Sequence, residues 1–180
     1  MAMANRITPT TLGFLLASSA VPLVAYCQVY LTEDQAAQSV FPGEVFAKKV
    51  LQLTPDEISK IEEKSGERVR HPAVTVFVSP KKNVVFIDEV LGKHEFITYA
   101  VGVTAKKTVQ GIEIMDYRES YGYDVRKPEW RKQFVGKDSS SPLRLNKDIV
   151  NISGATLSSS HVTAGVRRVL NTYEIIRDRL

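Results

Sequence analysis

The alternation of hydrophobic and polar residues predicts a helical part, a strand-rich part and a final helix. Thr32 and Thr54 are each followed by acidic residues within three positions. A threonine in the N-cap position accepts a hydrogen bond from the first helical turn, and acidic residues suit the positive end of the helix dipole. The sequence therefore predicts one helix from Thr32 to the turn at residues 41–43, and another over residues 55–64.

The middle of the chain changes to the pattern of strands. Four stretches are rich in β-branched and aromatic residues and are separated by short polar turns, which is typical of an antiparallel meander. A fifth apolar stretch predicts a last strand. The expected strands cover residues 73–79, 83–91, 95–104, 108–117 and 145–152.

The carboxyl-terminal segment has the periodicity of an amphipathic helix from about Ser158 or Ser159 to Arg179. Its apolar positions recur every three or four residues, which places them on one face. With no internal repeat and no long linker, the pattern predicts one α+β domain, an antiparallel meander with flanking helices. The apolar stripe consists of Val162, Val166, Val169, Leu170, Tyr173 and Ile176.

The amino terminus has the pattern of an export signal. Residues 7–32 carry no charge, and a short apolar core is interrupted by Pro22. Such a core is too broken for a membrane span and suits the apolar region of a signal peptide. We expect a signal peptide over residues 1–27, cleaved near residue 20 or 27, and a domain over residues 28–180. An uncleaved anchor and a lipid anchor at Cys27 are the alternatives.

Composition narrows the possible functions. The chain of 180 residues is 43% hydrophobic, and its net charge of +4 is spread along the sequence. A nucleic-acid-binding protein would concentrate basic residues on one face. Cys27 is the only cysteine, which excludes a disulfide framework and a cysteine-based metal site.

The segment 153–159, Ser-Gly-Ala-Thr-Leu-Ser-Ser, is the strongest candidate for chemistry. A glycine turn that leads into a helix offers unpaired N–H groups and the positive end of the helix dipole to a phosphate. The ordinary alternative is a helix N-cap, where serine and threonine are common. His161 and Trp130 are further candidates for cofactor contacts. A surface histidine and a tryptophan at the edge of the core are their ordinary interpretations.

Four ordered segments carry a family resemblance, residues 97–103, 111–123, 130–137 and 153–156, and the helix starts at Leu31-Thr32 and Leu53-Thr54 are similar to the amino-terminal part of the same family. Together they resemble the FMN-binding domain family found in the flavin subunits of the Rnf and Na+-pumping NADH:quinone reductase complexes. The sequence departs from the family pattern at two places. Val150 stands where the family usually has an aspartate, and Ser120-Tyr121-Gly122 stands in place of Thr-Pro-Gly.

The resemblance implies FMN held through a phosphoester bond to Thr156, at the turn before the final helix. It also implies an FAD-dependent FMN transferase that makes this bond, because an unactivated threonine hydroxyl is a poor nucleophile. No catalytic residue and no metal ligand is expected. The other expected FMN contacts are Ser153, Gly154, Ala155, Leu157, Ser158, Ser159, Glu119, Tyr121, Gly122 and Lys137.

These features predict an exported flavoprotein, in the periplasm or on the outer face of the inner membrane. We expect it to relay electrons between a membrane oxidoreductase and an acceptor, and to meet the membrane only through partners or an uncleaved leader. An electron-transfer protein is favoured over an enzyme because no general acid–base pair stands out. The alternatives are a small exported flavin-dependent reductase or dehydrogenase with its own substrate, and a cofactor-free binding module.

Overall fold

The computed structural model describes residues 30–119 and 122–180, so the expected leader over residues 1–27 lies outside the described part. Five strands form one antiparallel sheet in the order β1-β2-β3-β4-β5. This is the meander that the sequence predicts, and the α+β class is confirmed. The strands are β1 (Ala47–Gln52), β2 (Ala73–Val78), β3 (Val84–Leu91), β4 (Phe96–Val103) and β5 (Val109–Tyr117).

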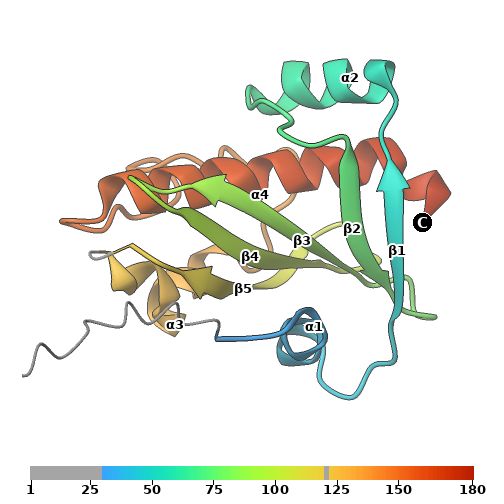
Figure 1. Cartoon of the computed structure of the whole chain (residues 1–180), viewed down its shortest axis with the longest axis horizontal. Coiled ribbons are helices and arrows are strands. Elements are labelled where there is room, and N and C mark those ends of the chain that lie inside the picture. Colours follow the sequence, from blue (N-terminus) through green and yellow to red (C-terminus); the bar gives the residue numbers. More distant parts are fainter. Residues whose placement is uncertain (1–29, 120–121) are drawn as a thin grey trace, which may run out of the picture.

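Helices cover both faces of the sheet (Figure 1). The long helix α4 lies along one face, α2 packs on the outer side of α4, and α1 lies on the opposite face. One short helix and three 3-10 turns complete the described fold around them. The helical elements are α1 (Glu33–Val40), α2 (Pro55–Ser65), α3 (Pro128–Arg131), α4 (Thr156–Ile176), η1 (Tyr123–Arg126), η2 (Lys132–Phe134) and η3 (Arg177–Arg179).

Two hydrophobic clusters follow from this layering. The larger one lies between α4 and the sheet, and its fully buried members include Phe86, Tyr99 and Leu170. The smaller one joins α1 to the other face of the sheet through Ala37 and Met115. Because α4 is buried by the sheet and by α2 together, its position and the direction of its first turn are fixed by the core.

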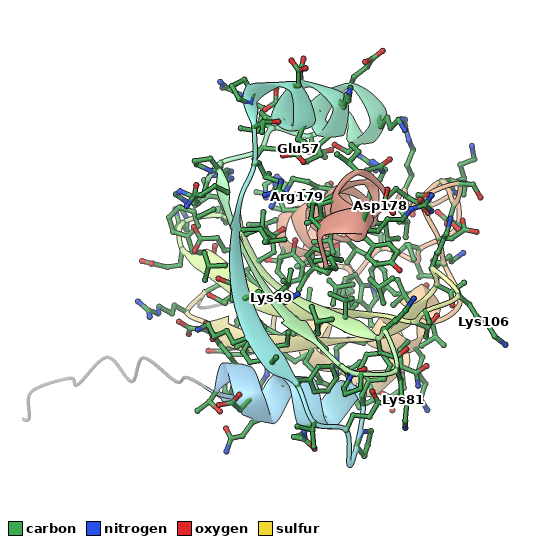
Figure 2. The ribbon with its side chains drawn as sticks, turned by 90° about the vertical axis from the view of Figure 1, so that its right-hand side faces the viewer. Lys49, Glu57, Lys81, Lys106, Asp178 and Arg179 are labelled. Carbon is green, nitrogen blue, oxygen red and sulfur yellow. The ribbon has the colours of Figure 1, made fainter. Side chains whose placement is uncertain are left out.

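An ion pair holds the end of the chain against α2. Arg179, which follows α4, lies 2.8 Å from both carboxylate oxygens of Glu57. Figure 2, which looks at this end of the molecule, shows the two labelled side chains between α2 and the end of the final helix. The contact ties α2 to the end of α4 that lies far from its first turn.

Both amino-terminal helix caps are confirmed. Thr32 accepts from the N–H of Gln35, and Thr54 accepts from the N–H of Glu57. In each case the third residue reaches back to the N–H of the threonine, which completes a capping box. These two helices therefore satisfy their first turns with side chains of their own sequence.

The observed strands differ from the expected ones at two places. Strand β1 was not expected, because most of its side chains are exposed and give no alternating pattern. The expected strand over residues 145–152 is absent from the structure, which has only a single bridge between Leu145 and Ile149 there. A turn at Asn146, with φ of 60°, bends the chain back on itself. The run is apolar because Ile149 enters the core.

Helix α4 also begins earlier than the expected start at Ser158 or Ser159, at Thr156. Thr156 is therefore the first residue of the helix and not part of the turn before it. The helix ends at Ile176, and the remaining expected residues form η3. Among the described residues, no helix has the length and apolar character that a membrane span requires.

Candidate functional site

A tight turn leads into α4. The N–H of Ala155 donates to the carbonyl oxygen of Ile152 at 3.0 Å, and Gly154 has φ of 80°. Residues with a Cβ rarely adopt this left-handed backbone, so the turn requires glycine at this position. The turn leaves Ser153 and Gly154 exposed and buries Ala155.

The first turn of α4 lacks the capping that α1 and α2 have. Ala155 is its N-cap residue, and no side chain of the described chain caps it. The backbone N–H groups at the start of an α-helix have no partner within the helix. Those of Thr156, Leu157 and Ser158 therefore offer donors at the positive end of a 21-residue helix.

Thr156 presents its side chain at the surface beside these donors. Nδ2 of Asn151 donates to Oγ1 of Thr156 at 3.2 Å. The other side-chain atom of the amide, Oδ1, lies 2.9 Å from the hydroxyl of the buried Ser159. Asn151 thus links the threonine hydroxyl to the second turn of the same helix.

The segment before the turn is held by residues 130–134. Nε1 of Trp130 donates to the carbonyl oxygen of Val150 at 2.9 Å, and the N–H of Val150 donates to Oε1 of Gln133 at 2.7 Å. Trp130 is buried against Phe134 with ring centroids 5.1 Å apart. It therefore belongs to the core edge, and it acts on the turn through the backbone of Val150.

Glu119 organises the loop between β3 and β4 on the other side of the site. Its Oε1 accepts from the N–H of His94 at 2.6 Å and from that of Glu95 at 3.1 Å. Burial by itself raises the pKa of Glu119, but the N–H groups of His94, Glu95 and Lys93 outweigh it and hold the pKa below the usual value. Glu119 is therefore a carboxylate at neutral pH.

The two loops enclose a groove of about 490 Å³ at the first turn of α4. This volume lies within the range of about 300–1,000 Å³ that is typical of small-molecule sites. Lys93 and His94 provide positive or titratable groups on one wall, and the half-exposed Leu157 provides an apolar surface on the other. The lining residues are Lys93, His94, Glu119, Gly154, Ala155, Thr156, Leu157 and Ser158.

Gly122 supports the groove from behind. A Cβ at Gly122 would lie 2.5 Å from the hydroxyl of Tyr117 and 2.9 Å from the Cβ of Ala155. The hydroxyls of Tyr117 and Ser158 lie 3.1 Å apart, and burial raises the pKa of Tyr117. The segment after β5 can therefore pack on the first turn of α4 only because residue 122 has no side chain.

The structure brings most of the expected site residues together. Six of them line the groove, and the exposed Ser153 lies in the adjoining turn. Ser159 is fully buried and contacts Asn151 and the backbone. Nζ of Lys137 pairs with Asp148 at 3.1 Å, and Lys137 is not part of the groove lining. Tyr121 lies outside the described residues.

Sequence reasoning missed Lys93 and His94 as groove residues, and Asn151 as the partner of Thr156. The sequence did offer one signal for Lys93 and His94, because the Gly92-Lys93-His94 turn lies between two predicted strands and close to the family-like segment 97–103. His161 contacts the carbonyl oxygen of Leu91 and is not among the groove-lining residues. Among the described residues, no cluster of histidine, cysteine and acidic side chains could hold a metal ion.

Comparison with known proteins agrees with this geometry. Residues 92–171, which contain the groove-lining residues, match the model of the FMN-binding domain. This part of the chain is accordingly an FMN-binding domain, and its cofactor is FMN. Among curated protein sequences there is no significant match to the chain.

A solved structure shares the fold. It is the crystal structure of a subunit of the Na(+)-translocating NADH-quinone reductase from Parabacteroides distasonis, which aligns with a TM-score of 0.52 and 16% sequence identity. The alignment covers 80% of this chain and 83% of that chain. Because 80% of the chain is aligned, the similarity extends beyond the matched residues 92–171.

The groove also fits FMN chemically. The N–H groups at the start of α4 suit a phosphate, and the exposed Thr156 lies at the same helix end. Leu157 and the open groove offer an apolar surface to a flavin ring, while Lys93 adds positive charge. The protein is a flavoprotein, and flavins carry out electron transfer.

Proposed function

We propose that this protein carries FMN on Thr156 through a phosphoester bond and relays electrons between a membrane redox partner and an acceptor. The observation that carries the proposal is the exposed hydroxyl of Thr156 on the uncapped first turn of α4, inside the matched domain. The likeness to a quinone reductase subunit also supports electron transfer.

Attachment requires a transferase that uses FAD. Oγ1 of Thr156 bonds to the phosphorus of the FMN half, and the bond from that phosphorus to AMP breaks. AMP leaves, and the hydroxyl proton passes to a base of the transferase. The phosphodiester keeps one negative charge, which the N–H groups of the first turn of α4 stabilise.

The groove favours a relay over an enzyme with its own substrate. Glu119 is held as a carboxylate by backbone N–H groups and is therefore a poor proton donor near neutral pH. The basic side chains in the described groove lining are Lys93 and His94, and both are exposed to solvent. An open groove with this lining suits electron exchange with varied partners.

Location is a further part of the proposal. The uncharged residues 7–32 support export, with the flavin domain in the periplasm or on the outer face of the inner membrane. A covalent bond suits this location, because a cofactor lost outside the cytoplasm is not readily replaced. Partners or an uncleaved leader would then provide any membrane contact.

Intact mass and a visible spectrum test the attachment. Protein made together with the transferase should be heavier by one FMN less one water, and Thr156→Val should remove this increment. Thr156→Ser is the control, because it keeps a hydroxyl at the same position. Wild-type protein that shows only the unmodified mass would contradict covalent attachment.

Reaction rates with varied partners test the relay. After reduction, the protein should pass electrons to small acceptors at rates that follow driving force and depend little on acceptor shape. His94→Asn should change these rates by less than about threefold, since a general acid typically contributes a factor of about 100 or more. Saturation by a single organic substrate, with a large loss in His94→Asn, would establish the reductase alternative.

A further inference from the structure

Asn151 is a polar side chain that reaches the hydroxyl of Thr156 and that lies outside the segments carrying the family resemblance. It lies five residues before Thr156, across the turn at residues 152–155. Its amide nitrogen is 3.2 Å from Oγ1 of Thr156. The neighbouring Val150, at the position of the usual aspartate, is 68% exposed and points its apolar side chain to solvent.

We propose that Asn151 is a positioning residue for flavin attachment, which holds the Thr156 hydroxyl in the orientation that the transferase requires. This inference rests on the proposed attachment at Thr156. It assigns to Asn151 a role in the modification of this chain that is separate from binding the attached cofactor.

The direction of the hydrogen bond gives the role its chemistry. The amide nitrogen has only protons to offer, so Oγ1 of Thr156 is the acceptor in this contact. The threonine hydroxyl proton is therefore not used in it and remains available to an external base. One lone pair of Oγ1 is occupied by Asn151, and the remaining lone pair is available to attack phosphorus.

The rest of the amide is anchored within the same helix. Oδ1 of Asn151 lies 2.9 Å from the hydroxyl of Ser159, which is fully buried and also contacts the carbonyl oxygen of Ala155 at 2.9 Å. Trp130 and Gln133 fix the backbone of Val150 immediately before Asn151. Asn151 is thereby held on both sides, and the first turn of α4 presents Thr156 in one orientation.

The test measures the rate of FMN attachment by intact mass. The full chain, made without the transferase, is incubated with purified transferase and FAD. Asn151→Ala and Asn151→Asp should each react at least about tenfold more slowly than wild type, the size expected when one orienting hydrogen bond is lost. Ser159→Ala keeps the amide donor to Thr156 but removes the anchor of Oδ1, so it should slow attachment by less than either substitution of Asn151 does.

Two further measurements separate positioning from a general structural role. Melting temperature and noncovalent FMN affinity, measured without transferase, should be nearly the same in wild type and in Asn151→Ala, which adds no charge beside the expected phosphate position. The side-chain amide proton signals of Asn151 should shift in Thr156→Val, which tests the hydrogen bond without any attachment.

The outcomes distinguish this inference from the proposed function. If wild type gains no mass, attachment at Thr156 is wrong and the role of Asn151 falls with it. If wild type gains mass and Asn151→Asp reacts as fast or faster, only the role of Asn151 is wrong. Slow reaction accompanied by an equal loss of melting temperature or FMN affinity would also overturn it, since the defect would then be structural.

Discussion

Helices α2 and α4 begin in opposite ways. The first turn of α2 is closed by its own sequence, where Thr54 and Glu57 exchange hydrogen bonds in a capping box. The first turn of α4 has Ala155 at the cap position and no capping side chain from the described residues. The longer helix therefore leaves its N–H donors open and relies on packing around Ala155 and Ser158 for its position.

The difference shows how this fold separates stability from binding. A capped helix end satisfies its donors and has none left for a ligand, whereas an uncapped end keeps them for an anion. Helix α4 tolerates the open end because the core buries its length between the sheet and α2. The candidate site thus lies at a helix end that has no side-chain cap, and packing of the rest of the helix offsets the missing hydrogen bond.

The largest effect is expected where packing replaces the cap. Gly122→Ala places a Cβ against the hydroxyl of Tyr117 and the Cβ of Ala155 at a residue with φ of 90°. We expect a loss of about 3 kcal/mol in the free energy of unfolding, because overpacking adds to left-handed backbone strain. Denaturant unfolding measures it.

Gly43→Ala is the matched control for this substitution. Gly43 has φ of 77° and nothing within 4 Å of a built Cβ, so it reports backbone strain alone. Its cost should be about 1 kcal/mol. Equal losses in the two variants would show that the contact between residue 122 and the first turn of α4 does not support the helix end.

An intermediate effect separates the two helix starts directly. Thr54→Ala should lower the free energy of unfolding by about 1 kcal/mol, since it removes the cap of α2. Thr156→Ala should change it by less than about 0.5 kcal/mol, since Thr156 is exposed and caps nothing.

The same two variants should show the opposite order of effects on FMN attachment. Thr54→Ala should gain FMN as wild type does, and Thr156→Ala should gain none. Unfolding curves and intact mass on the same preparations provide both comparisons. A destabilisation of Thr156→Ala as large as that of Thr54→Ala would show that the start of α4 is capped after all.

Much of the fold was predictable because local and tertiary signals agree in the central strands. Buried β-branched residues from β2 to β5 mark strands, and Thr32 and Thr54 mark helix starts. Strand β1 was missed since an edge strand with Lys48, Lys49 and Val50 exposed has no buried face that would mark it. Residues 145–152 were wrongly predicted to form a strand, because an apolar residue such as Ile149 can also enter the core from a loop.

The candidate site was predictable to the extent that it is continuous in sequence. The turn and first turn of α4 lie within seven residues, and a family resemblance marks them. Lys93 and His94 reach the groove only because Glu119, more than twenty residues later, accepts from their loop. A motif predicts Lys137 as a cofactor contact, but its pairing with Asp148 depends on a loop whose shape the pattern does not reveal.

The smallest effect concerns the pH dependence of the loop that Glu119 holds. The pKa of Glu119 is lower in the folded chain than its ordinary value of 4.5. Its carboxylate therefore contributes stability that is fully present above pH 4.5 and is lost as the pH falls through the lowered folded pKa. Protonation makes the carboxyl group of Glu119 a weaker acceptor for the N–H groups of His94 and Glu95, and the loop that forms one wall of the groove becomes less tightly held.

Amide hydrogen exchange across this pH range, corrected for the intrinsic pH dependence of exchange, measures the effect. Protection of residues 93–95 should fall below pH 4.5 in wild type, and Glu119→Gln should show reduced protection already at neutral pH. Asp138→Asn is the matched control, because Asp138 also has a lowered pKa but caps a different turn, at Ser140 and Ser141. A loss of protection at residues 93–95 that Asp138→Asn reproduces, or that Glu119→Gln leaves unchanged, would show that general acid unfolding opens the loop and that Glu119 does not hold it.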